Sequence, residues 1–233
     1  MENSENVLDE NAGITAIIPA YNESLRIGEV IRTARQFLPV LVVDDGSTDD
    51  TAEISRLAGA NIISYSPNRG KGAALRAGFT HVLSSDCKAA VTLDADGQHD
   101  PGDIPGFLAY YRKTNSDLII GMRDFRDMPL TRRLANSLGQ LSFSWAVGGW
   151  IPDNQSGFRL LSKRLMEQML ISSEMGFEFE VEMIVRCIQM GYHLEWVPIR
   201  TIYTGESSHI KPLKHIKEFT RMVILTRRMR DSI

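Results

Sequence analysis

The sequence is poor in cysteine, in long apolar runs and in net charge, and each shortage excludes a class of protein. Only two of its 233 residues are cysteines, Cys87 and Cys187, which excludes a disulfide-stapled scaffold and a cysteine-type zinc site and fits a reducing compartment. No apolar run approaches the ~18 residues that span a bilayer. A formal net charge of -3 and a pI of about 6.0 argue against a nucleic-acid partner.

The composition and the N-terminus indicate an ordinary folded protein of the cytoplasm. Apolar residues make up 43% of the chain and charged residues 24%, which is typical of a globular domain with a substantial core. Residues 1–12 are acidic and polar without periodicity, so we expect a flexible tail and not a secretory signal. Residues 13–210 are then expected to form one domain, followed by a C-terminal helix over 211–233.

Short apolar runs alternate with helical patterns through the first half of the chain. The runs at 14–18, 40–43, 62–65, 90–93 and 118–120 predict strands, and the segments between them have helical spacing. Such alternation indicates βαβ units, so we predict a single Rossmann-like α/β domain with a mostly parallel sheet flanked by helices. The second half is less regular, with helices predicted near 130–146, 163–170 and 178–190 and strands near 158–161 and 194–203.

Polar clusters follow three of the predicted strands, at 19–23, 44–47 and 94–99. Asp, Asn, Ser and Gly are also usual in turns and helix caps, so one cluster alone would carry little weight. In an open parallel sheet, however, the carboxyl ends of the strands share one edge, and ligands bind in the crevice there. Three clusters at successive strand ends therefore predict a binding site.

An aspartate pair in the third cluster suggests a metal ion. Asp94 and Asp96 lie two residues apart just past a strand, and carboxylate oxygens suit Mg²⁺ or Mn²⁺, which commonly bridge to substrate phosphates. Gln98 or His99 could add a ligand.

The segment 68–72 opens a predicted helix and suggests an anion site. Backbone N–H groups at a helix N-terminus favour anions, and Arg69 and Lys71 add positive charge. The glycine spacing matches neither the Walker motif nor the complete dinucleotide fingerprint. These features together indicate a nucleoside diphosphate held through a metal.

The motifs in this order resemble the family-2 inverting glycosyltransferases with the GT-A fold, and among these the polyprenyl- and dolichyl-phosphate sugar synthases. The resemblance covers the chain from Ile14 to about Lys211. It rests on PAYNE at 19–23, VDDGSTD at 43–49, NRGKGAAL at 68–75, LDADGQHDP at 93–101, GMR at 121–123 and DNQSGFRLL at 153–161.

The resemblance implies a role for each matched position. The nucleotide pocket would be formed by Pro19, Tyr21, Glu23, Asp44, Asp45, Arg69, Lys71, Asp94, Ala95 and Asp96. The metal would be held by Asp94, Asp96 and Gln98. The acceptor phosphate would be received by Arg123, Arg132 and Asn136, and the sugar side would be closed by Asp153 and Arg159.

The implied reaction is a Mg²⁺- or Mn²⁺-dependent transfer of a hexose from GDP-mannose or UDP-glucose, or a similar donor, to polyprenyl or dolichyl phosphate. A phosphate acceptor is ionised near pH 7 and needs no general base. Three alternatives stay open. The same fold could use a sugar hydroxyl as acceptor, with Asp153 as base. The protein could also be a non-catalytic nucleotide-sugar-binding subunit or a nucleotidyltransferase.

Three glutamates, Glu178, Glu180 and Glu182, alternate with apolar residues. We favour a helix beginning near Glu178, in which the glutamates face its positive N-terminal end. A second metal site is the less favoured alternative.

The C-terminal segment 211–230 is basic and amphipathic. It carries seven lysines and arginines against one acidic residue, Glu218, and apolar residues recur in it at helical spacing. Such a helix can lie on an anionic membrane surface, which would place the enzyme peripherally on the cytoplasmic face of a membrane. Alternatively, it packs on its own domain or on a membrane-embedded partner protein.

Overall fold

A computed structural model describes residues 11–123, 130–176, 178–200, 202, 220–221, 223–224 and 226–227, without the side chains of 130–138. The strands are β1 (Ile14–Ala20), β2 (Val40–Asp44), β3 (Asn61–Ser64), β4 (Ala89–Thr92), β5 (Leu118–Arg123), β6 (Arg159–Ser162) and β7 (Leu194–Ile199). In this described part they form one sheet in the order β3-β2-β1-β4-β6-β5-β7. Every pairing is parallel except those of β6, which runs antiparallel to both β4 and β5.

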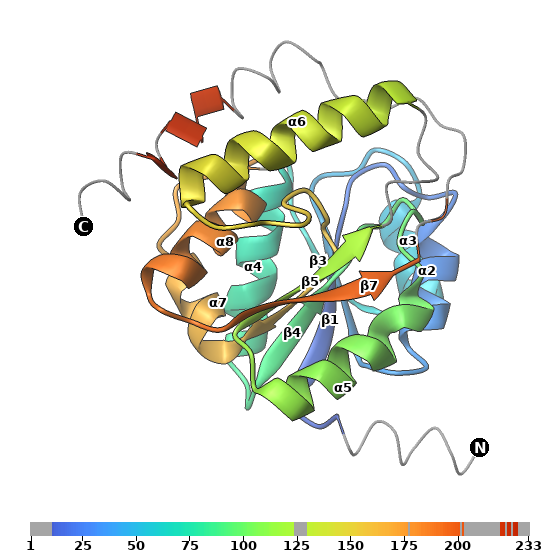
Figure 1. The fold of residues 1–233 in the computed structure, drawn as a ribbon. Coiled ribbons are helices and arrows are strands. Elements are labelled where there is room, and N and C mark those ends of the chain that lie inside the picture. Colours follow the sequence, from blue (N-terminus) through green and yellow to red (C-terminus); the bar gives the residue numbers. More distant parts are fainter. Residues whose placement is uncertain are drawn as a thin grey trace.

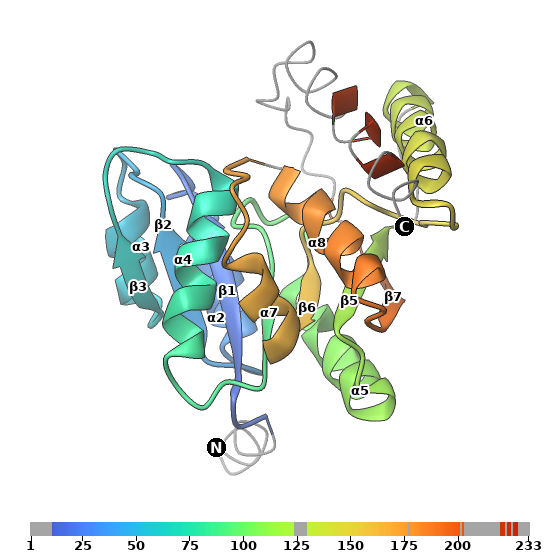
Figure 2. The same ribbon diagram turned by 90° about the vertical axis from the view of Figure 1, so that its left-hand side faces the viewer.

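Helices cover both faces of this sheet (Figures 1 and 2). They are α2 (Ile27–Ala34), α3 (Thr51–Leu57), α4 (Lys71–Leu83), α5 (Ile104–Thr114), α6 (Leu130–Val147), α7 (Lys163–Met169) and α8 (Glu178–Gln189), with a 3₁₀ turn at Pro101–Asp103. Helices α4, α7 and α8 pack on one face, and α2 and α5 on the other. Alternate side chains of a strand point to opposite faces of the sheet. Ile17 of β1 therefore belongs to a first hydrophobic core, under α4, α7 and α8, and Ile18 belongs to a second core, under α2 and α5.

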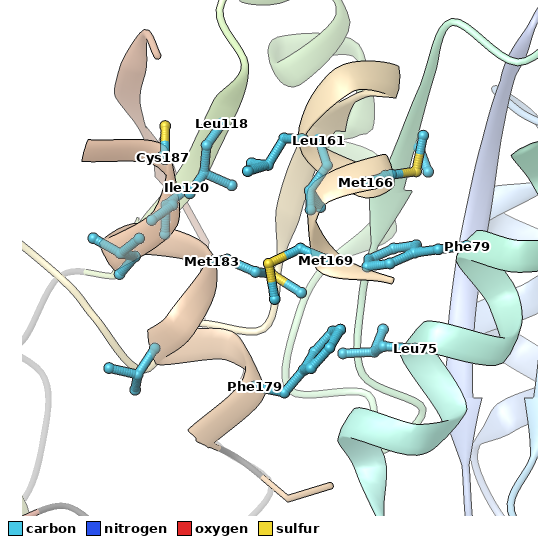
Figure 3. Close-up of a cluster of buried hydrophobic side chains, with 14 of the residues drawn as sticks. Leu75, Phe79, Leu118, Ile120, Leu161, Met166, Met169, Phe179, Met183 and Cys187 are labelled. Carbon is cyan, nitrogen blue, oxygen red and sulfur yellow. The ribbon is translucent and has the colours of Figure 1, made fainter. Parts of the chain in front are cut away.

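The first core fixes α4 against α8, which matters for the site. Figure 3 shows Leu75 and Phe79 of α4 facing Phe179 of α8, and the Phe79 and Phe179 ring centroids lie 6.1 Å apart. At the start of α4, a Cβ on Gly72 would lie 2.8 Å from Cβ of Phe179. Only glycine allows this approach, so the first turn of α4 touches the segment that leads into α8.

The predicted fold class is confirmed, and most predicted elements lie within a few residues of the observed ones. The reversed direction of β6 was not predicted, because burial makes its sequence look like that of any inner strand. The segment with helical spacing between the first two strands is helical only from Ile27 to Ala34. The tail over residues 1–10 lies outside the described residues.

The C-terminal segment packs on the domain where it is described. Residues 220–221, 223–224 and 226–227 are helical, as predicted. Val223 belongs to the same buried cluster as α8, and Thr226 is also buried. This supports the alternative in which the apolar stripe of the helix packs on its own domain. Within the described residues, no helix is both long enough and apolar enough to cross a membrane.

Candidate active site

A cavity of ≈ 350 Å³ lies at the carboxyl ends of β1, β2 and β4, where the three polar clusters were predicted to meet. It is lined by Pro19, Ala20, Tyr21, Glu23, Asp45, Asn68, Gly70, Lys71, Ala74, Asp94, Ala95 and Asp96. The structure therefore brings together eight of the ten residues predicted for the nucleotide pocket. Asp44 and Arg69 are the two that do not line it.

Asp44 organises a loop instead. Its Oδ1 accepts a hydrogen bond from Ser47 N at 3.0 Å, and the side chain is buried. The same loop is tied to the β1–α2 loop, because Asn22 N donates to Ser47 Oγ at 2.9 Å and Thr48 N donates to Asn22 Oδ1 at 2.8 Å. Two of the three polar clusters therefore hold each other in place at the mouth of the cavity.

Asp45 binds the amides that precede α4. Its carboxylate accepts hydrogen bonds from Arg69 N at 2.8 Å and Gly70 N at 2.7 Å, while Gly72 N donates to Met175 O at 2.8 Å. The predicted anion site at this helix start thus already holds an anion, the protein's own carboxylate. The Arg69 guanidinium lies over the Tyr65 ring, 4.7 Å from its centroid.

Lys71 forms the centre of a charged cluster beside the cavity. Its Nζ lies 2.5 Å from Asp94 Oδ1 and 3.0 Å from Glu180 Oε1. Burial alone would lower the pKa of Lys71, but the two carboxylates raise it above its ordinary value. Burial likewise opposes ionisation of Asp94, yet the Lys71 ammonium lowers the pKa of that carboxyl to about 2.

Glu180 is the site residue that sequence reasoning did not assign. The predicted helix at Glu178 is confirmed, but Glu180 does not simply face its positive end, since its side chain is buried against Lys71. The alternation of the three glutamates was the available signal. It could not single out Glu180, because only the packing of α8 on α4 decides which one faces inward.

The aspartate pair offers donors to a divalent cation. Asp96 lines the cavity, and both burial and the neighbouring Asp94 charge raise its pKa. His99 is buried with its Nδ1 3.7 Å from Asp94 Oδ2 and without a hydrogen-bond partner, and burial lowers its pKa to about 4, so the ring is neutral at pH 7. The two carboxylates are the oxygen donors that Mg²⁺ or Mn²⁺ prefers, and the neutral imidazole beside Asp94 adds no competing positive charge.

The side chains that could bind a metal do not converge on one point in this structure. Among the described residues, no three His, Cys, Asp or Glu side chains are arranged to hold an ion. Gln98, the predicted third ligand, is exposed, and the contact that ties it to the aspartate pair is made by its backbone N, 2.9 Å from Asp96 Oδ1. Asp94 is held by Lys71, whereas Asp96 lines the cavity and forms no ion pair within the part of the chain that the structure describes.

A second charged pair, Arg123 with Asp153, lies at the end of β5. Arg123 Nε and Nη2 donate to Asp153 Oδ2 and Oδ1 at 2.7 and 3.0 Å. Asp153 Oδ1 also accepts from Gln155 N at 3.0 Å and Ser156 N at 3.2 Å. Arg159 is fully buried and donates to the carbonyls of Asn154, Ser156 and Glu180, which fixes this loop against α8. Arg132 and Asn136 lie on α6, but their side chains are outside the described part.

These features define a class of protein and then a family. A mostly parallel sheet with a cavity at its carboxyl edge and an aspartate pair beside it is the arrangement of the GT-A glycosyltransferases. The chain belongs to glycosyl transferase family 2, whose family model matches residues 15–170. The protein is therefore a glycosyltransferase.

Individual relatives are similar to this chain in sequence, and a solved structure is similar to it in fold. An uncharacterised protein of Methanocaldococcus jannaschii is 34% identical over 204 residues, covering 83% of this chain and 83% of the relative. A UDP-N-acetylglucosamine–dolichyl-phosphate N-acetylglucosaminyltransferase of Methanococcus voltae is 31% identical over 222 residues, covering 83% and 87%. Glucosyl-3-phosphoglycerate synthase of Mycobacterium tuberculosis shares the fold, with a TM-score of 0.73 and 20% identity, covering 98% of this chain and 84% of that chain.

The two hydrogen bonds of Asp45 generate a prediction about stability. Asp45→Ala leaves two amides without their charged acceptor, so the free energy of unfolding should fall by about 2–4 kcal/mol in urea denaturation. The control is Asp50→Ala, because Asp50 is exposed and its side chain caps nothing; the change there should stay within about 0.5 kcal/mol. An unchanged unfolding free energy for Asp45→Ala would show that the helix start does not depend on this carboxylate.

Proposed function

We propose that this glycosyltransferase moves a sugar from a nucleoside diphosphate donor, with the help of Mg²⁺ or Mn²⁺, to the phosphate of a polyprenyl or dolichyl lipid. The name of the M. voltae relative supports the acceptor class, since that protein is named for transfer to dolichyl phosphate. The cavity at the strand ends supports the donor class, because it combines an open pocket with carboxylates suited to a metal-bound diphosphate.

The observation that carries the acceptor half of the proposal is the state of Asp153. Its side chain is 1% exposed, and both of its oxygens already accept hydrogen bonds from Arg123. A general base must reach the proton that it removes, so this carboxylate is poorly placed to activate a sugar hydroxyl. An ionised phosphate acceptor avoids that requirement, because it attacks without losing a proton.

In this proposal, one end of the site binds the donor and the metal, and the other end binds the acceptor phosphate. Tyr21, Glu23 and Asp45 would line the nucleoside side of the cavity, and Asp94 and Asp96 would bind the metal. A bound divalent cation would neutralise charge on the departing diphosphate. On the other side, Arg123, held rigidly by Asp153, and Arg132 would present guanidinium groups to the acceptor phosphate. The phosphate oxygen would attack the anomeric carbon from the face opposite the diphosphate and invert it.

The metal half of the proposal is tested at Asp96. Asp96→Ala should lower transfer by about 10²–10³-fold, because the cation that would offset the charge of the departing diphosphate loses one of its ligands. The assay measures nucleoside diphosphate release from UDP-N-acetylglucosamine, UDP-glucose and GDP-mannose with undecaprenyl phosphate. Asp86→Asn, an exposed aspartate before β4 at the opposite edge of the sheet, should keep full activity. Full wild-type activity in excess chelator would contradict metal dependence.

The acceptor half is tested at Arg132. Arg132→Ala should raise the KM for the lipid phosphate about tenfold while the KM for the donor stays near normal, because a guanidinium fork matches phosphate geometry. Arg133→Ala is the matched control, since consecutive helical residues face different directions. Equal loss of donor and acceptor affinity would place Arg132 on the diphosphate instead. Transfer to polyprenol or to a sugar hydroxyl as fast as to polyprenyl phosphate would overturn the acceptor class.

A surface of α6 supports contact with the membrane that holds such an acceptor. Leu141 and Trp145 of α6 are 55% and 62% exposed, and Trp150, three residues after the end of this helix, is 63% exposed. The Arg227 guanidinium lies 4.9 Å from the Trp145 ring centroid, so this surface adjoins the C-terminal helix. Tryptophan beside a cation suits a membrane–water interface, where one side of the ring is apolar and the other is wet.

Liposome flotation tests this contact. Trp145→Ser should reduce flotation with anionic liposomes several-fold, and wild-type flotation should weaken at 1 M salt, where the Debye length is about 3 Å. Leu57→Ser is the control, because Leu57 is 79% exposed on α3, at the far end of the molecule from α6 in Figure 2. Point variants are preferable to truncation, since truncation would remove the buried Val223. Unchanged flotation of Trp145→Ser would remove α6 from the membrane contact.

A further inference from the structure

Lys71 is shared by carboxylates from two different parts of the chain. Asp94 approaches its Nζ from the end of β4, at 2.5 Å, and Glu180 approaches from α8, at 3.0 Å. The Lys71 and Glu180 side chains are only 16% and 5% exposed. Gly157 packs directly against the cluster, because a Cβ added to it would lie 2.6 Å from Asp94 Oδ2 and 2.9 Å from Lys71 Nζ. The Lys71 and Glu180 side chains therefore have little room to move apart into solvent.

This arrangement creates a conflict at Asp94. The same carboxylate that would bind a divalent cation is already paired with an ammonium group, and two cations at one carboxylate repel each other. A lysine that lost Asp94 and had no other partner would be a buried, uncompensated charge, which is strongly unfavourable. Glu180 removes this penalty, because it already lies at ion-pair distance from Lys71.

We propose that Glu180 is a positioning residue for the metal site, which retains Lys71 when a divalent cation takes over Asp94. Lys71 is then the resident counter-ion of Asp94 in the metal-free protein, and Glu180 sets how readily the metal replaces it. This inference rests on the proposed metal-dependent function, and it adds to the aspartate pair a residue on α8 that does not touch the ion.

The proposal is tested without turnover by measuring the affinity of the purified full chain for Mn²⁺ alone. Electron paramagnetic resonance detects the ion that stays free in solution. Glu180→Gln should weaken Mn²⁺ binding about tenfold, because Lys71 would then lack the Glu180 carboxylate when the cation takes over Asp94. Glu180→Asp should weaken it too, since the shorter side chain keeps its charge but withdraws from Lys71. Glu182→Gln is the control, because Glu182 lies on the same helix but pairs with Arg186 at 2.6 Å; its effect should stay below about twofold.

A double-mutant cycle separates this role from the direct attraction between Glu180 and the ion. Lys71→Met should bind Mn²⁺ more tightly than wild type, and in that background the effect of Glu180→Gln should shrink to about twofold. If circular dichroism shows that Lys71→Met does not fold, the Glu180→Asp comparison decides, because direct attraction predicts nearly wild-type binding for that variant.

The outcomes distinguish this inference from the function on which it rests. If Glu180→Gln or Glu180→Asp binds Mn²⁺ with wild-type affinity, the positioning role of Glu180 is overturned, while the metal-dependent function still stands. Absence of Mn²⁺ binding by the wild type removes the metal from the proposed function, and this inference with it.

Discussion

The site depends on how the start of α4 is held. Asp45 of the β2 loop binds the amides of Arg69 and Gly70, and Met175 O receives the amide of Gly72. The same helix is packed against α8 through Phe79 and Phe179. These contacts place Lys71 between a strand end and another helix, so one fixed helix start connects the cavity floor, the aspartate pair and α8.

The charges of the site are balanced internally. Lys71 pairs with Asp94 and Glu180, and Arg123 pairs with Asp153, so most of the buried charges already have partners. Pairing of this kind lets a polar pocket persist inside the protein, because an unpaired buried charge would cost several kcal/mol. It also means that a highly charged donor must compete with existing ion pairs. Asp96, whose pKa is raised by burial and by Asp94, is the acidic group whose environment most favours an incoming cation.

Much of the fold and the nucleotide side of the site could be predicted, for identifiable reasons. Strands such as 40–43 and 90–93 are short, apolar and bounded by turn residues, and their carboxyl ends must share an edge in a parallel sheet. That geometry brought Asp45, Asp94 and Tyr21 to one cavity, as expected. The direction of β6 could not be predicted, because a buried strand has the same apolar pattern in either orientation.

The sequence by itself determined the family, the mostly parallel sheet and the cavity edge on which the polar motifs meet, because these follow from local patterns and from the order of elements along the chain. The tertiary structure decided which polar group meets which. In the folded chain Asp44 accepts a hydrogen bond from its own loop, and Asp45 accepts hydrogen bonds from the amides before α4. Glu180 pairs with Lys71, although the two are over a hundred residues apart in the sequence. Such pairings depend on helix packing and on glycines that allow close approach, and neither leaves a periodic signal in the sequence.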